Sequence, residues 1–328
     1  MGKFLEAEKP IQTKFKYESP YFSTSARKDG VYKRKPRAFC IPRENAEENL
    51  FQGIRQAALA YFEQQGIKWH DGQDRKPSNH LCDSQVCCVN FLFAFANQPE
   101  ALVELLHPVF PNIAQVMPME TEGQFVSFEW IGAENYLREK VGKNRKRTRG
   151  ANFTSTDAAV MFEDKAGMRQ IVLIEWKYTE SYSRASYKIS KRGTDRTIIY
   201  APLYNAEGCP LDKSLLSDFG DLFYEPFYQL MRQQFLAREM EKWQELGAQK
   251  VSVLHIAPDR NTDFQKITSP ALQEDGKTAT EKWKELVRYK DRFASVNTEN
   301  LFGRFPVERY PDMQEWWEYL RQRYSFLA

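Results

Sequence analysis

Residues 155–178 read STDAAVMFEDKAGMRQIVLIEWKY, and this stretch decides how the centre of the chain is expected to fold. Its apolar runs at 156–162 and 170–178 have the length and composition of β-strands. The segment EDKAGMR between them carries the glycine and the charges of a hairpin loop, so the two strands should pair antiparallel. The second run is apolar on both faces at its start, which is typical of a strand inside a sheet.

Charged residues interrupt one face of the second strand only. Because strand side chains alternate, Glu175 and Lys177 share a face with Leu173, and the opposite face stays apolar. If the loop is centred near Ala166, Asp157 on the first strand lies opposite Glu175. Opposed side chains have Cβ atoms about 5 Å apart, and two carboxylates there repel each other unless a divalent cation binds both. A register slip of one residue would turn Asp157 to the other face and remove this site.

The strand pair resembles the core of the PD-(D/E)XK nucleases, the superfamily of restriction-endonuclease-like folds. The resemblance is carried by STD at residues 155–157 and EWK at residues 175–177, and it covers about residues 125–257. Thr156 stands where the name-giving proline would be, a departure that leaves the metal ligands in place. The fold that the resemblance implies is α/β: a restriction-endonuclease-like core with a central mixed β-sheet flanked by helices, plus helical N- and C-terminal additions.

The resemblance also implies which residues would act. Asp157, Glu175 and the backbone carbonyl of Trp176 would hold Mg²⁺ or Mn²⁺. Lys177 would orient a water molecule, and it would either help to deprotonate that water or only position it. A cation lowers the pKa of bound water and neutralises phosphate charge, and a lysine that is partly desolvated near a cation should have a lowered pKa.

Two further parts of the family pattern have candidates in this chain. An acidic residue on the helix before the first core strand often supports the metal. Glu134 in GAENYLREKV matches it, Glu129 and Glu139 are alternatives, and ordinary helix-surface solvation is the competing interpretation of Glu134. A later helix often supplies a glutamine or a basic residue to the site. Gln229 and Gln233 in FYQLMRQQ match it and share one helical face, although a structural role suits either of them.

Two basic segments flank the strand pair in sequence. KNRKRTRG at residues 143–150 precedes the first strand, and KISKRGTDR at residues 188–196 follows the second. Basic side chains that neutralise phosphates release counterions, so the two segments around one acidic site favour nucleic acid as the substrate. The resemblance favours DNA, while the residues themselves would suit RNA as well. The candidate contacts are Lys143, Arg145, Lys146, Arg147, Arg149, Lys188, Lys191 and Arg192.

The remaining elements follow from hydrophobic periodicity. Residues 1–43 show neither a helical nor an alternating period and are expected to form an extended arm. Helices are expected at about 44–65, 84–97, 100–106, 133–141 and 221–246, with strands at about 126–130 and 250–257. The chain is accordingly divided into an arm and helical region (1–120), a nuclease-like core (121–260) and a C-terminal helical region that packs on the core (261–328).

Composition limits the ligands, the location and the cross-links that are expected for the protein. The net charge of +3 is too small to identify a nucleic-acid binder by itself. No apolar run reaches the roughly 18 residues that cross a bilayer, so no membrane is expected. Five irregularly spaced cysteines without a signal peptide argue against a disulfide framework and favour the cytoplasm. The residues His70, His80, Cys82, Cys87 and Cys88 lack the paired spacing of a zinc site.

The combined expectation is a Mg²⁺-dependent endodeoxyribonuclease of restriction or defence type, possible as a homodimer because cutting both strands commonly needs two sites. Two alternatives stay open: a nucleic-acid-binding module of the same fold without activity, and a structure-specific repair or resolvase nuclease. For Asp157, Glu175 and Lys177 themselves, the structural alternative is a salt-bridge cluster on the surface of the sheet.

Overall fold

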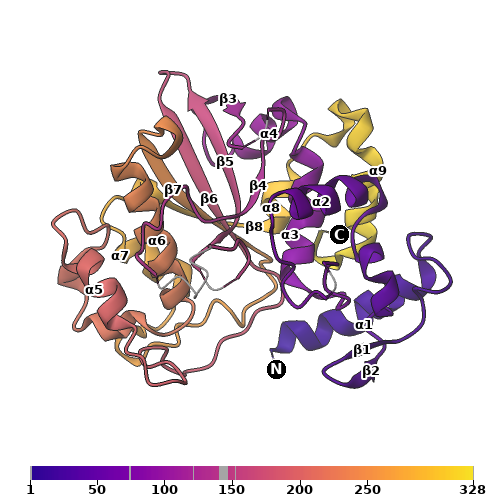
Figure 1. The fold of residues 1–328 in the computed structure, drawn as a ribbon, viewed down its shortest axis with the longest axis horizontal. Coiled ribbons are helices and arrows are strands. Elements are labelled where there is room, and N and C mark those ends of the chain that lie inside the picture. Colours follow the sequence, from indigo (N-terminus) through magenta and orange to yellow (C-terminus); the bar gives the residue numbers. More distant parts are fainter. Residues whose placement is uncertain (1, 74, 121, 140–146, 152, 328) are drawn as a thin grey trace.

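A six-stranded mixed β-sheet occupies the centre of the part of the chain that the structure describes, and helices cover both of its faces (Figure 1). This computed structural model describes residues 2–73, 75–120, 122–139, 147–151 and 153–327. The strands lie in the order β3-β5-β6-β7-β8, and β4 also pairs with β5. They are β3 (Ile113–Met117), β4 (Ser127–Trp130), β5 (Thr156–Asp164), β6 (Arg169–Trp176), β7 (Lys250–Ala257) and β8 (Phe293–Asn297).

The predicted register of the central hairpin is confirmed. Strands β5 and β6 are antiparallel, with Ala158 facing Ile174 and Val160 facing Val172, so every facing pair is equally distant from Ala166. Strands β6, β7 and β8 then run parallel to one another. The expected strand at residues 250–257 coincides with β7, and the alternating residues near 126–130 form β4.

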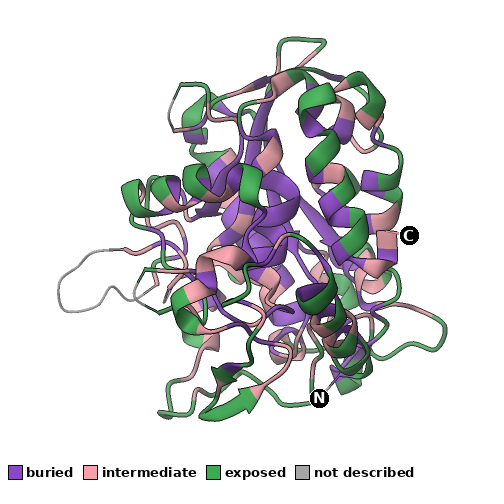
Figure 2. Cartoon of the chain, turned by 90° about the vertical axis from the view of Figure 1, so that its right-hand side faces the viewer, coloured by how far each residue is buried: buried purple, intermediate pink, exposed green. Residues whose placement is uncertain are grey.

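The two faces of β6 belong to two separate hydrophobic cores, as the alternation of its side chains predicts. Val172 and Ile174 pack in the core under helices α1, α2, α3, α4, α8 and α9. Ile171 and Leu173 pack in the core under α5, α6 and α7, on the other side of the sheet in Figure 1. Figure 2 shows the buried strands at the centre with the exposed residues on the outer helices and loops.

Nine α-helices lie within the described residues, and most of the predicted helices are among them. No single helix in that part of the chain is long and apolar enough to cross a membrane, and α3 and α4 reach the required length only as a pair bent by 118°. The helices are α1 (Lys3–Glu18), α2 (Gln52–Gln64), α3 (Ser84–Leu92), α4 (Pro99–Leu106), α5 (Thr197–Asn205), α6 (Phe227–Lys242), α7 (Ala279–Leu286), α8 (Thr298–Gly303) and α9 (Gln314–Arg323).

The extended arm predicted for residues 1–43 is wrong in its first half, which is helix α1. Its buried face consists of Phe4, Glu8, Gln12, Phe15 and Lys16, spaced at three to four residues. Three of these five are polar, so the stripe that faces the protein does not register as a hydrophobic period. Residues 30–37 of the same segment form the small hairpin of β1 (Gly30–Tyr32) and β2 (Lys35–Arg37).

The helix predicted at 133–141 is also wrong over the described residues 133–139, which are turns and coil. Gly132 and Arg138 both have left-handed backbone, with φ of +76° and +54°. The guanidinium of Arg147 donates hydrogen bonds to the carbonyls of residues 131–134. These carbonyls therefore find a partner without forming a helix.

A buried arginine joins both ends of the chain to the body of the protein. Arg323 on α9 is fully buried, and its Nε donates to Gln12 Oε1 on α1 at 3.0 Å. Its two terminal nitrogens donate to the carbonyls of Asn49 and Leu81 at 2.6 and 3.0 Å. Every one of these acceptors is neutral, so the charge is stabilised by dipoles alone.

Replacing this residue, Arg323→Met, should lower the free energy of unfolding by about 3 kcal/mol or more, because several buried acceptors lose their donor at once. Urea denaturation measures the effect. Arg321→Met on the exposed side of the same helix is the matched control and should stay within about 0.5 kcal/mol of the wild type. Equal losses in the two variants would contradict the role assigned to Arg323.

Candidate active site

The two predicted acids meet at one end of the sheet. Asp157 lies near the start of β5 and Glu175 near the end of β6, in register through the neighbouring pair Ala158 and Ile174. The Oδ2 atom of Asp157 accepts a hydrogen bond from the backbone N–H of Trp176 at 2.7 Å. Glu175 is almost completely buried, whereas Asp157 keeps a partial opening to solvent. The acids therefore face each other at a point that a ligand can reach.

Both carboxylate oxygens of Glu175 are bound by neighbouring side chains. Lys177 Nζ lies 2.5 Å from Glu175 Oε1, and both residues are buried. Gln233 on α6 donates from Nε2 to Glu175 Oε2 at 2.8 Å and to the carbonyl of Ser155 at 2.6 Å. Its own Oε1 is buried without a hydrogen-bond partner among the described residues. The predicted meeting of Asp157, Glu175, Lys177 and Gln233 is therefore present in the structure.

A third carboxylate, that of Glu129, lies on the strand next to Asp157. The pairs Phe128 with Ala158 and Trp130 with Thr156 place Glu129 beside Asp157 across β4 and β5. Its carboxylate accepts hydrogen bonds from Gln85 Nε2 on α3 and from Ser155 Oγ, both at 2.6 Å.

The backbone of Glu129 is strained. Its φ of +49° is left-handed, which costs a non-glycine residue roughly 1–2 kcal/mol. Arg149 holds this segment by donating from Nε to the carbonyls of Phe128 and Glu129 at 3.0 and 3.2 Å. Strain that the surroundings hold in place is common at functional sites, and here it fixes the position of a buried acid.

The electrostatics of the cluster disfavour its negative charges. Burial raises the pKa of Asp157 well above its ordinary value, and the charges of Glu175 and Glu129 raise it further against the opposing effect of Lys177. Burial likewise raises the pKa of Glu129, although its hydrogen bonds from Ser155 and Gln85 act in the other direction.

The pKa of Lys177 is raised in this arrangement. Burial lowers it, but the nearby charges of Glu175, Tyr182 and Asp157 outweigh burial, and the pKa rises well above its ordinary value. The lowered pKa was expected for a lysine beside a bound cation and stays a prediction; in the structure the ammonium rests against the carboxylate of Glu175 instead. Lys177 is a cation here at neutral pH.

Two residues around the cluster had no assigned role in the sequence. His255 on β7 faces Glu175 across the parallel pair β6 and β7, and its Nδ1 lies 3.1 Å from Ser295 Oγ. Burial, aided by the charge of Lys177, lowers the pKa of His255 to about 3. Tyr182 lies in the segment after β6, and its hydroxyl is 3.5 Å from Gln229 Oε1. Gln229 thus lies one helical turn from Gln233 and bounds the same cluster through Tyr182.

The structure corrects the choice among the three candidate glutamates. Glu134 is exposed in the turn that replaces the predicted helix, and its carbonyl is held by Arg147. Glu139 accepts hydrogen bonds from Thr154 and from Tyr200, so it fixes the approach to β5. Glu129, named only as an alternative, is the acid that joins Asp157 and Glu175.

The two basic segments also differ from the prediction. Arg149 is buried and pairs with Glu120, and Arg147 is committed to the carbonyls of residues 131–134, so neither is free to contact a substrate. Lys188, Lys191 and Arg192 are exposed, as a phosphate contact requires. The remaining candidates Lys143, Arg145 and Lys146 lie outside the described residues.

The donor set of this cluster suits a hard divalent cation. Among the described residues, no group of three or more His, Cys, Asp or Glu side chains stands in position to hold a metal ion, and all five cysteines are free. The acids instead accept hydrogen bonds from protein donors, foremost Lys177 and Gln233 on Glu175. Mg²⁺ needs only one or two carboxylates when water and phosphate complete its shell. Asp157 and Glu175 therefore have the oxygen chemistry that Mg²⁺ prefers, with Lys177 and Gln233 bound to Glu175 in this structure, and the partnerless Oε1 of Gln233 is a further oxygen beside them.

The repulsion predicts that neutralising one acid stabilises the protein when no divalent cation is added. Asp157→Asn keeps an acceptor for the Trp176 N–H, removes a buried like charge and should raise the free energy of unfolding by about 1 kcal/mol at pH 7. Because its pKa is raised, Asp157 in the folded wild type takes up a proton at a higher pH than it does in the unfolded chain. The difference in the free energy of unfolding between Asp157→Asn and the wild type should therefore shrink as the pH falls from 7 to 5. Urea titrations measure it, with Glu163→Gln on the same strand as control. A variant less stable than the wild type would contradict the repulsion.

The buried histidine predicts a second pH effect of opposite sign. With a folded pKa of about 3 and an unfolded value of about 6.5, His255 takes up a proton only in the unfolded chain between those limits. The wild type should lose about 2 kcal/mol relative to His255→Asn between pH 6.5 and 5. Thermal denaturation across this pH range tests it, and parallel curves for the two proteins would show that His255 is protonated in the folded state.

Comparison with known proteins agrees with the fold class. The family described as Restriction Endonuclease associating with ARP matches residues 12–325, which is nearly the whole chain. No curated protein and no solved structure matches the chain. The match covers the C-terminal part of α1, the strands that carry the acids and all of α9, so it is not a local likeness. The chain belongs to the family of restriction endonucleases associating with ARP.

Proposed function

We propose that this chain is a Mg²⁺-dependent endodeoxyribonuclease of PD-(D/E)XK type that acts in restriction or defence. The observation that carries the proposal is the meeting of Asp157, Glu175 and Lys177 on one face of adjacent strands. A surface salt-bridge cluster would not be buried, and Glu175 and Lys177 are 1% and 5% exposed. Buried groups of like charge are costly to keep, so a ligand that compensates them is the natural explanation.

The cation would be held by Asp157, Glu175 and the backbone carbonyl of Trp176, with Glu129 in the supporting place first given to Glu134. Bound there, Mg²⁺ or Mn²⁺ would neutralise charge on the scissile phosphate and lower the pKa of a bound water. The partial opening of Asp157 to solvent supports this assignment, because phosphate and water must enter to complete the cation's shell.

Lys177 acts in this proposal as a charged donor. Lys177 Nζ lies 2.5 Å from Glu175 Oε1, and a cation held by Glu175 would leave this ammonium available to a phosphate oxygen. A protonated amine there would stabilise the charge that develops on the phosphate. Gln233 keeps Glu175 oriented by bonding both that carboxylate and the Ser155 carbonyl across the two strands.

DNA as the substrate rests on the family, whose description names restriction endonucleases. The exposed Lys188, Lys191 and Arg192 follow β6 closely in sequence and would contact its phosphates. We further propose that two chains act together to cut both strands, that the protein works in the reducing cytoplasm where its five free cysteines persist, and that it associates with the ARP named in the family description.

Purified protein should cut plasmid DNA in the presence of Mg²⁺, and Lys177→Ala should cut at least about 100-fold more slowly, since a preorganised charge at the phosphate is removed. Chelation with EDTA should stop the reaction. Gel assays of supercoiled plasmid over time measure the rates, and circular dichroism shows that each variant is folded.

Glu129→Gln and Glu134→Gln form a matched pair for this assay, because only Glu129 lies with the other acids. The first should slow cleavage at least about tenfold, and the second should leave it unchanged. Equal cleavage rates for the wild type and Lys177→Ala would contradict the proposed active site. Binding of DNA without any cleavage by the wild type would instead favour an inactive binding module.

A further inference from the structure

A small basic hairpin projects from the N-terminal region. Its strands β1 and β2 are joined by Lys33 and Arg34, whose φ values of +48° and +63° are both left-handed. A two-residue turn of this kind is type I′, for which Asn-Gly is preferred because it adopts positive φ with little cost. A lysine and an arginine are strained there, and backbone strain of this kind is common at functional positions.

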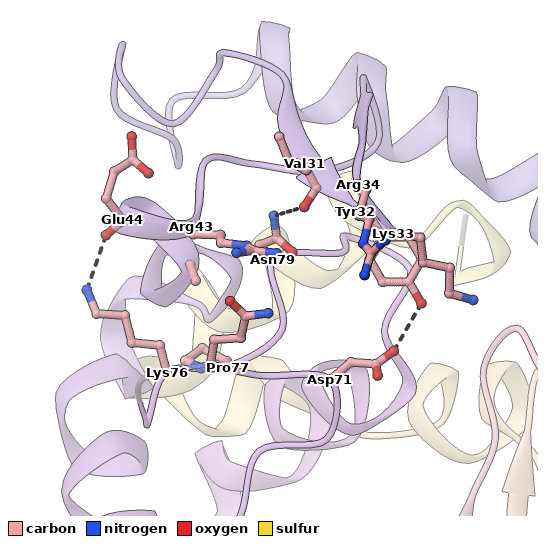
Figure 3. Close-up of a pocket in the computed structure, with 12 residues that line it drawn as sticks. Val31, Tyr32, Lys33, Arg34, Arg43, Glu44, Asp71, Lys76, Pro77 and Asn79 are labelled. Atoms are coloured by element: carbon pink, nitrogen blue, oxygen red, sulfur yellow. Dashed lines mark hydrogen bonds between the residues drawn. The ribbon is translucent and has the colours of Figure 1, made fainter.

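The hairpin forms one wall of a cavity of about 480 Å³, shown in Figure 3. Lys33 and Arg34 come to this cavity from the hairpin turn, and Arg43 and Lys76 come from two other segments of the chain. We call these four side chains the basic pocket. The lining also includes the two acids Glu44 and Asp71, so its four cations outnumber its carboxylates.

The charges of the basic pocket are largely uncompensated. Among the residues that the structure describes, Lys33, Arg34 and Arg43 form no ion pair with a carboxylate, and Lys76 pairs with Glu47 at 3.2 Å. Of the two lining acids, Asp71 accepts the hydroxyl of Tyr32 at 3.0 Å. Lys35 and Arg37 on β2 add two further cations without carboxylate partners in the same part of the chain. An anion would find several free donors here.

A short series of contacts leads from the basic pocket to the acids. Tyr32 bonds Asp71, and the backbone N–H of the preceding His70 donates to Gln85 Oε1 at 2.7 Å. Gln85 in turn donates to Glu129 at 2.6 Å. In Figure 1 the hairpin lies at the lower end of the molecule, beneath α1, and Figure 2 shows its exposed strands at the lower end as well. A polyanion at the acids could therefore continue over the hairpin.

We propose that the basic pocket binds the phosphate backbone of duplex DNA beside the position that is cut. This inference rests on the proposed nuclease function and adds a substrate contact to it. The hairpin tip and the residues 188–192 then supply cations from two separate regions of the chain, before and after the acids in sequence. A duplex, with its regular row of phosphates, matches cations spread over the tip and the cavity better than a single small anion does.

The test is binding of a fluorescently labelled 30-base-pair duplex by anisotropy, without divalent cation, over a series of KCl concentrations. The variant Lys33→Asn/Arg34→Gly installs the residues that a type I′ turn prefers, so it should fold at least as well as the wild type in a thermal melt. It should nevertheless bind roughly tenfold or more weakly near 100 mM KCl. The slope of log K against log salt should fall by about 2, or about 1 for each phosphate that the variant no longer neutralises.

The control variant Lys165→Ala/Arg169→Ala removes the same charge at the exposed β5–β6 turn, at the opposite end of β5 from Asp157, and should bind as the wild type does. Wild-type affinity and salt slope in Lys33→Asn/Arg34→Gly, with cleavage intact, would overturn this inference and leave the nuclease standing. Hairpin-dependent binding without any cleavage would support the contact and overturn the nuclease. A wild type that neither binds nor cuts DNA would overturn both.

Discussion

Two carboxylates that face each other across a pair of buried strands are the constraint on which the other features of this protein depend. Unit charges about 5 Å apart at an effective dielectric constant of 20 repel by about 3 kcal/mol, before any cost of burial. Asp157 and Glu175 are placed this way by strand register alone, so the fold cannot relax the repulsion without moving the sheet. Accordingly, hydrogen-bond donors surround the two carboxylates. They are Lys177, Gln233 and the backbone N–H of Trp176.

The layers around the sheet hold those donors in place. Helix α6 packs in the core beneath Ile171 and Leu173, and this packing sets Gln233 at the end of the strand where Glu175 lies. On the other side, helix α3 packs in the second core and brings Gln85 to Glu129. Helices packed in the two cores thus position side chains of the cluster from opposite faces of the sheet. The left-handed backbone of Glu129 shows that strain is tolerated where an acid must be positioned.

The sequence predicts those features that depend on local alternation and on a short loop. The register of β5 and β6 follows from a hairpin centred on Ala166, and the bounds of β7 follow from a continuous apolar run ended by Pro258. Gln233 could be found because a helix has a fixed period. In these cases the deciding information lies within about 25 residues.

The features that sequence reasoning missed depend on distant partners. Helix α1 hides its buried face because that face is polar and is satisfied by Arg323 and Tyr178, far away in sequence. From the sequence alone Arg149 is expected to be a surface charge, because its ion-pair partner Glu120 is brought to it only by the fold. Glu129 was only an alternative because the supporting acid was expected on a helix before β5, whereas Glu129 lies on strand β4 and reaches the site through its pairing with β5. Strands β3 and β8 lie at the edges of the sheet and owe their pairing to neighbours rather than to their own pattern.

The central claim is that the acids form a cation site from which Lys177 withdraws. Anomalous diffraction from crystals soaked in Mn²⁺ tests it most directly, because the ion's position is then observed together with that of the ammonium. We expect one strong peak between Asp157 and Glu175, near Glu129, with Lys177 Nζ displaced from its 2.5 Å contact. Ordered manganese elsewhere, with the contact between Lys177 and Glu175 intact, would contradict it.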